Sequence, residues 1–140
     1  MSDSVPIVDD YMARDLITFS PGDDIFTAVR KLLGERISGA PVVDKRGQLL
    51  GVLSKKDCFA VIYSASYHQE WGGRVEDYMS KEVATIESGT DIVKAADIFM
   101  HSTFRRFPVM RKGRITGQIS RADLLRALEG YWGGVAPPPR

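Results

Sequence analysis

The pentapeptide VDDYM at residues 8–12 returns as VEDYM at residues 75–79. At the same offset of 67 positions, from residue 8 to residue 75, the matches are Thr18 with Thr85, Gly22 with Gly89, Ala28 with Ala95, and Pro41 with Pro108. The second copy has no equivalent of Arg46, and beyond that point Ser54 and Asp57 match Ser120 and Asp123. Such self-similarity predicts a repeat architecture. We expect repeat 1 over 8–62, a linker over 63–74, repeat 2 over 75–128 and a flexible tail over 129–140.

Both repeats contain the same order of expected elements. A short β-rich run, at 17–19 and again at 84–86, ends at a glycine-containing turn. A helix should begin at Asp23 or Asp24, because a carboxylate there caps free amides, and its apolar residues keep helical spacing. A strand pair follows at 40–43 and 49–53, repeated at 107–110 and 115–119, and closing helices cover 54–63 and 120–128. The predicted fold class is α/β (α+β): two pseudo-symmetric β-α-β-β-α repeats packed sheet to sheet, since neither repeat has enough apolar surface alone.

Composition and charge exclude several classes of function. The chain has 19 Lys+Arg against 18 Asp+Glu, so there is no basic excess for nucleic acid or an anionic membrane. No apolar run approaches the length of a membrane span, and the first ten residues lack the pattern of a secretory signal, so a cytoplasmic location is expected. The two histidines, His68 and His101, are isolated, which predicts no metal site. No nucleophile and base are paired, so we expect no catalysis and no catalytic cofactor.

The shared motifs resemble those of the CBS domain family over nearly the whole chain. The resemblance rests on the D-x-M entry at 10–12 and 77–79, the Thr-containing strands, the Pro-Val segments at 39–42 and 106–109, and the closing S-x-x-D motifs. It implies a regulatory module that binds an adenosyl compound such as AMP, ADP, ATP or S-adenosylmethionine. It also implies a homodimer and a protein partner that the module regulates.

The S-x-x-D motifs have two interpretations. As a capping box, the serine accepts an amide hydrogen bond and the aspartate reaches back to the cap amide. In the family, the same aspartate binds the two ribose hydroxyls, while the helix amides at 55–57 attract phosphate. The residues before Pro41 and Pro108 are candidates for the base pocket, because a residue before proline is extended. Purely structural interpretations also remain: Thr18 and Thr85 as ordinary strand residues, and Phe107 as a core residue.

The family arrangement crosses the repeats. Site one would combine Thr85, Arg106, Phe107 and Pro108 with Ser54, Lys55 and Asp57; site two would combine Thr18, Ser38, Gly39, Ala40 and Pro41 with Ser120, Arg121 and Asp123. Site two is expected to be the better site, because Gly39-Ala40 is more open than Arg106-Phe107. The alternative function is a structural dimerisation module without ligand. We also expect the aromatic linker to pack on the module or its partner, residues 134–140 to be disordered, and Cys58 to be a buried small hydrophobe.

Overall fold

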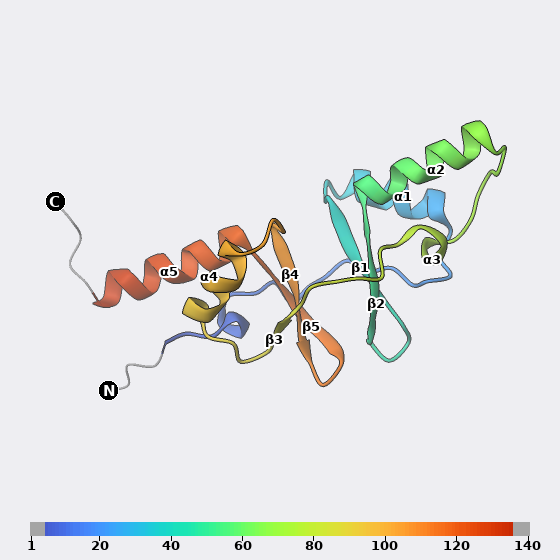
Figure 1. Cartoon of the computed structure of the whole chain (residues 1–140). Helices are drawn as coiled ribbons and strands as arrows, with labels where there is room; N and C mark the ends of the chain where they lie inside the picture. Colours follow the sequence, from blue (N-terminus) through green and yellow to red (C-terminus); the bar gives the residue numbers. More distant parts are fainter. Residues whose placement is uncertain (1–4, 136–140) are drawn as a thin grey trace. The chain divides into compact units, whose positions relative to one another are not determined.

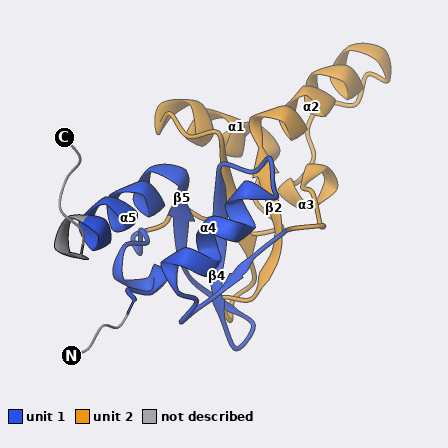
Figure 2. Ribbon diagram, turned by 60° about the vertical axis from the view of Figure 1, so that its left-hand side comes forward, with its two compact units in different colours: residues 1–15, 84–140 blue, residues 16–83 orange. Residues whose placement is uncertain are grey.

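The structure, a computed structural model, describes residues 5–135 and the side chains up to residue 132. It divides into two compact units, one formed by residues 16–83 and the other by residues 1–15 together with 84–140 (Figures 1 and 2). Because residues 16–83 lie between the two parts of the other unit in the sequence, we call the first the inner unit and the second the outer unit. The division does not follow the sequence repeats, because each unit contains the opening segment of the other repeat.

The inner unit pairs two helices with a two-stranded sheet. Its elements are α1 (Ile25–Gly34), β1 (Gly39–Val43), β2 (Leu49–Ser54), α2 (Lys55–Tyr67) and the short α3 (Val75–Tyr78). Strands β1 and β2 are antiparallel, as the hairpin pattern predicts. Helix α1 begins where expected, since the side chain of Asp24 accepts a hydrogen bond from the Thr27 amide. The core is formed by residues from all these elements, among them Ile25, Leu32, Val42, Leu53 and Val75.

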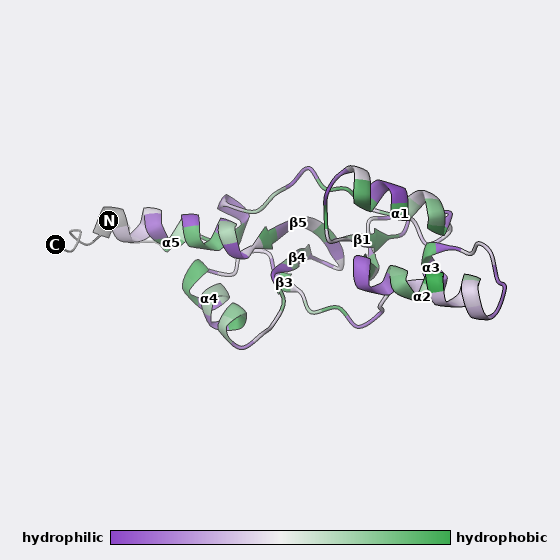
Figure 3. Cartoon of the chain, turned by 90° about the horizontal axis from the view of Figure 1, so that it is seen from above, coloured by the Kyte–Doolittle hydropathy of each residue, from purple (hydrophilic) through white to green (hydrophobic). Residues whose placement is uncertain are grey.

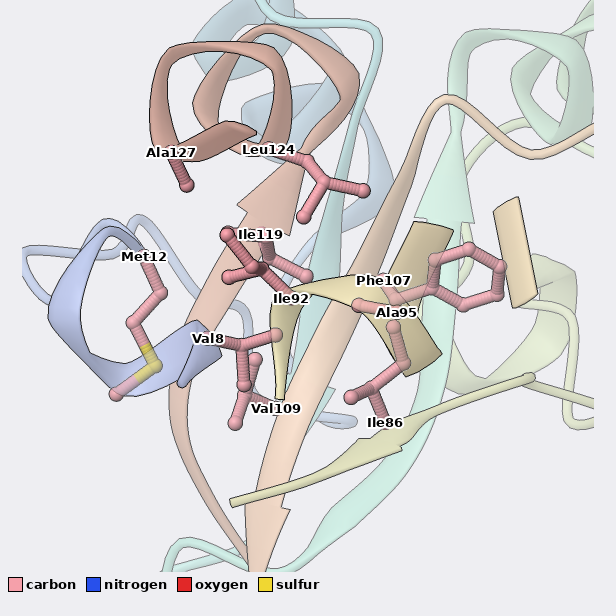
Figure 4. Packing of buried hydrophobic residues seen from close by; sticks show 10 residues of the cluster. All are labelled: Val8, Met12, Ile86, Ile92, Ala95, Phe107, Val109, Ile119, Leu124 and Ala127. Carbon is pink, nitrogen blue, oxygen red and sulfur yellow. The ribbon is translucent and has the colours of Figure 1, made fainter. Parts of the chain in front are cut away.

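The outer unit repeats this plan with one more strand. Its elements are the 3-10 turn η1 (Val8–Asp10), β3 (Ile86–Glu87), α4 (Ile92–Met100), β4 (Arg106–Arg111), β5 (Arg114–Ser120) and α5 (Arg121–Val135). The strand order is β3-β4-β5, with β3 parallel to β4 and β5 antiparallel to β4. Figure 4 shows the core, in which Val8 and Met12 of the first segment lie among Ile92, Ile119 and Leu124. The predicted fold class, with two pseudo-symmetric α/β repeats, is confirmed.

The opening segments, which we call lead-in segments (5–13 and 72–80), are exchanged between the repeats. The first pairs with β5 through hydrogen bonds between Ala13 and Gln118 in both directions, each 2.9 Å long. The second pairs with β2 in the same way, through Ser80 and Val52. Both approaches need a glycine: a Cβ on Gly117 would lie 2.8 Å from the Ala13 carbonyl oxygen, and one on Gly51 would lie 2.6 Å from that of Ser80. The glycines shared by the repeats therefore admit the lead-in segments.

Three expectations about element boundaries are wrong. The run at 17–19 forms only an isolated bridge from Phe19 to Val42, and β3 is two residues long. Helix α2 continues to Tyr67, beyond its expected end at residue 63. Helix α5 continues to Val135 through three glycines of the expected tail, because Ala127, Leu128 and Tyr131 extend its apolar stripe onto the core. The rest of the predicted disorder, at 136–140, lies outside the described residues.

The linker aromatics are largely exposed, and the expectation that the linker packs on the module or its partner stays a prediction. Tyr67 and Trp71 are 74% and 76% exposed. Tyr67 instead stacks on Tyr63 of the preceding turn, with ring centroids 4.8 Å apart. Among the described residues, no helix combines the length and apolar character needed to cross a bilayer.

Candidate functional site

Each closing helix begins at a complete capping box. In the inner unit, the Ser54 hydroxyl accepts a hydrogen bond from the Asp57 amide at 3.1 Å, and Asp57 Oδ2 accepts one from the Ser54 amide at 2.9 Å. In the outer unit, Ser120 and Asp123 form the same pair at 3.1 and 3.0 Å. The capping interpretation is therefore confirmed at both S-x-x-D motifs. It uses only one oxygen of each carboxylate.

The second oxygen of each aspartate has a different partner in each unit. Asp57 Oδ1 accepts a hydrogen bond from the Ser80 hydroxyl at 3.0 Å, and Ser80 follows the lead-in motif of repeat 2. Asp123 Oδ1 pairs instead with the guanidinium of Arg126, one turn along α5. The residues equivalent to Ser80 and Arg126 in the other repeat are Ala13 and Ala60, which have no polar side chain. The two carboxylates are thus alike in their caps and differ in the partner of the second oxygen.

The segments before the two prolines lie beside these caps in the sheet register. Gly39 pairs with Ser54 in the inner unit, and Arg106 pairs with Ser120 in the outer unit. A Cβ on Gly39 would lie 3.0 Å from the Leu53 carbonyl oxygen and 3.2 Å from Ser54 Cα, so glycine permits this close strand approach. Within each unit, the predicted base segment and the predicted ribose aspartate therefore occupy the same end of one hairpin.

The helix amides are less available for phosphate than expected. The Lys55 amide donates to the Ser38 carbonyl at 2.8 Å, and the Arg121 amide donates to the Arg105 carbonyl at 3.0 Å. Since the third amide of each helix is held by its serine, only the second, of Lys56 or Ala122, has no such partner among the described residues. The side chains of Lys55 and Arg121 are exposed and remain candidates for phosphate contact.

Other predicted site residues divide by burial. Thr18, Thr85 and Ser38 are exposed, and Arg106 is half-buried. A third group contains Ala40, Pro41, Phe107 and Pro108, all of which are buried. The Phe107 ring packs edge-on against Phe99 and Phe104 in the outer core, with centroids 4.8 and 5.8 Å apart. The interpretation of Phe107 as a core residue therefore fits its ring, and only its backbone remains to contact a ligand.

Cys58 is buried beside the inner capping box, as expected for a small hydrophobe. Burial raises the pKa of its thiol, and the neighbouring Asp57 carboxylate raises it further. Both effects disfavour the thiolate, which is the reactive form of cysteine. The thiol is therefore part of the packing of α2.

The geometry of both hairpins and caps agrees with a comparison against protein families. The CBS domain model matches residues 8–64 and 75–130. The chain belongs to the CBS domain family. Each of its two CBS repeats contains one copy of the D-x-M and S-x-x-D motifs.

Individual relatives of this CBS pair include both short and long proteins. The crystal structure of CBSX2 in complex with AMP is 26% identical, with a TM-score of 0.77 over 89% of this chain and 96% of that one. An uncharacterized protein of Methanocaldococcus jannaschii is 26% identical over 89% of this chain and 44% of its own length. An inosine-5'-monophosphate dehydrogenase of the same organism is 27% identical over 88% of this chain, but the match covers only 24% of the enzyme. The chain thus spans less than half the length of these two relatives.

Sequence reasoning missed Ser80 and Arg126 as neighbours of the two aspartates. Arg126 had a local signal, since a residue three positions after an aspartate lies on the same helix face. Ser80 had none, because it reaches Asp57 only through the exchange of the lead-in segments.

Proposed function

We propose that this CBS pair is a regulatory module that binds an adenine nucleotide or another adenosyl compound. The observation that carries the proposal is the hydrogen bond of 3.0 Å that Asp57 Oδ1 accepts from the Ser80 hydroxyl. A carboxylate that caps its helix with one oxygen and accepts from a hydroxyl with the other has the hydrogen-bonding capacity to bind a ribose diol. Capping and ribose binding are therefore compatible roles of the same side chain.

The resemblance to CBSX2 supports the class of ligand. That protein binds AMP, and it matches this chain over most of both lengths. We assign the ribose contact to Asp57 and Asp123, phosphate contact to Ser54, Lys55, Ser120 and Arg121, and the base contact to the backbone around residues 38–41 and 106–108. The family arrangement, in which the base segment of one repeat serves the aspartate of the other, stays a prediction.

The test is a calorimetric titration of the parent chain and its aspartate variants with AMP, ATP and S-adenosylmethionine. Asp57→Asn and Asp123→Asn should each lose charge-assisted hydrogen bonds of about 1.5–3 kcal/mol and weaken binding at one site roughly ten- to hundredfold. Asp24→Asn and Asp91→Asn are matched controls, since these aspartates also cap helices but lie outside the S-x-x-D motifs. Equal losses in the controls, or no heat with any ligand, would contradict the proposal.

A dimerisation module is the second candidate, favoured by an apolar groove on each unit. Leu33, Phe59 and Ile62 line a groove of about 260 Å³ between α1 and α2. Met100, Leu125 and Leu128 line the equivalent groove of about 520 Å³ between α4 and α5. Figure 3 shows apolar colouring along much of α4. We propose that a second copy of the chain covers these grooves, whether or not a ligand is bound.

A further inference from the structure

The β4–β5 hairpin of the outer unit carries three cations at its tip. Arg111 ends β4, Lys112 and Gly113 form the turn, and Arg114 begins β5. All three cationic residues are exposed. Among the residues that the structure describes, none of the three forms an ion pair, although Glu87 lies on the adjoining strand opposite Met110. The charge of this tip therefore has no ion-pair partner among the described residues of the outer unit.

Two features of the tip are unfavourable for folding. Arg111 and Arg114 are direct cross-strand partners, and like charges directly opposite each other destabilise a strand pair. Lys112 has a φ of 52°, which lies in the left-handed region of the backbone. This region is energetically unfavourable for residues other than glycine. The turn needs positive φ at both central positions, but it does not need a cation at any of them. Local features that oppose stability without structural benefit point to a function.

The equivalent hairpin of the inner unit has a turn that is one residue longer, since Arg46 has no equivalent in the outer hairpin. Asp44 stands where the outer unit has Arg111, and its Oδ1 accepts hydrogen bonds from the Arg46 and Gln48 amides at 2.8 and 2.9 Å. Gln48 stands at the position of Arg114. The outer hairpin thus has guanidinium groups where the inner hairpin has a carboxylate and an amide. The inner unit thus forms an antiparallel hairpin between the equivalent strands without arginine at these two positions.

We propose that this basic tip binds an acidic segment of a partner protein. Arg111, Lys112, Arg114 and Thr116 line a hollow of about 400 Å³ at the tip. The planar guanidinium groups match carboxylates in a bidentate manner, and a bound anion would relieve the repulsion between the two arginines. A nucleic acid is disfavoured, because its affinity depends on many phosphate contacts, whereas this tip offers three cations on a chain of net charge +1. This inference is independent of nucleotide binding.

The test measures fluorescence anisotropy of a labelled oligoglutamate peptide with the full chain. We expect binding that weakens as salt is raised from about 20 mM to roughly 200 mM, because the contacts are exposed. The double variant Arg111→Ser with Arg114→Ser should weaken binding roughly three- to tenfold. Lys45→Ser with Arg46→Ser removes the same number of charges from the inner hairpin, and it should change binding by less than about twofold.

Further arms separate the sources of negative charge. A single-stranded oligonucleotide and tripolyphosphate, added as competitors, should each bind more weakly than the peptide at equal total charge. Tighter binding by either would overturn the choice of a carboxylate-bearing partner. Equal losses in the two double variants, or no peptide binding at low salt, would overturn the site itself. The peptide should also raise the melting temperature of the parent but not that of the Arg111/Arg114 variant, which reports on folded protein directly.

Discussion

At the scale of single residues, the two carboxylate oxygens of each of Asp57 and Asp123 have different partners. One oxygen holds the helix cap in each repeat, and the other contacts either a hydroxyl or a guanidinium. The proposed ligand would replace the second contact and leave the first intact. Arg126 also bears on the predicted ranking of the sites, since a ribose at Asp123 would displace a charged partner, whereas a ribose at Asp57 would displace a neutral one. Arg126→Ala is therefore the natural companion to the aspartate series.

Gly51 and Gly117 carry a steric prediction. Adding a methyl group at either position brings it within 3 Å of a lead-in carbonyl oxygen, so Gly51→Ala and Gly117→Ala should each destabilise the chain by about 1–3 kcal/mol. Gly22→Ala is the control, because a Cβ there has no neighbour within 4 Å, and it should change stability by less than about 0.5 kcal/mol. Urea denaturation of the three variants measures the difference. A Gly117→Ala variant as stable as Gly22→Ala would contradict the close packing of the lead-in segment.

Among elements, the lead-in segments are the least obvious from sequence and are held by specific polar contacts. Asp9 in η1 accepts hydrogen bonds from the Ser88 hydroxyl and the Gly89 amide, which join the first segment to the turn before α4. Burial raises the pKa of Asp9, but these hydrogen bonds, with Arg14 nearby, outweigh burial and hold it below its usual 3.8. The charged form of Asp9 is thus stabilised by folding.

The stability that Ser88 contributes should consequently depend on pH. Because the folded-state pKa of Asp9 is lowered, its contribution is complete above the unfolded-state value and is lost as pH falls through and below it. Ser88→Ala should therefore destabilise the chain more at about pH 7 than at about pH 3. Urea unfolding at both pH values tests this. Ser66→Ala, on an exposed part of α2, is the control. An equal pH dependence of the free energy of unfolding in both variants would contradict the role assigned to the Ser88–Asp9 hydrogen bond.

Element starts were predictable where the signal is local. Asp24 caps α1, and the Ser54 and Ser120 boxes open α2 and α5, because a cap depends on a few adjacent residues. Element ends were not: the glycines near residue 130 indicate a break, but packing of Tyr131 on the outer core outweighs a cost of about 1 kcal/mol per glycine. The burial of Phe107 likewise depends on Phe99 and Phe104, which a motif does not place.

At the scale of the whole molecule, the unpartnered grooves predict association. Phe59 and Leu125 are 68% and 65% exposed, and each lines the groove of its unit. Phe59→Ser with Leu125→Ser should shift the chain from dimer to monomer in sedimentation velocity at micromolar concentration, because apolar area drives such interfaces. Lys31→Ser with Glu129→Ser, two exposed charged positions on α1 and α5, should leave the dimer intact. A monomeric parent chain would refute the prediction.

The exchanged lead-in segments also bear on how the molecule is made. Residues 5–13 leave the ribosome before the inner unit, yet the surface that receives them includes Thr90 and Gln118, which are translated after the inner unit. The lead-in segment of the inner unit can pair with β2 once residue 80 has emerged, since Ser80 and Val52 form that pairing. During synthesis, residues 5–13 are therefore made before the backbone of Thr90 and Gln118 to which they bond. A chain that stops before residue 118 would carry residues 5–13 without the Gln118 backbone with which Ala13 pairs.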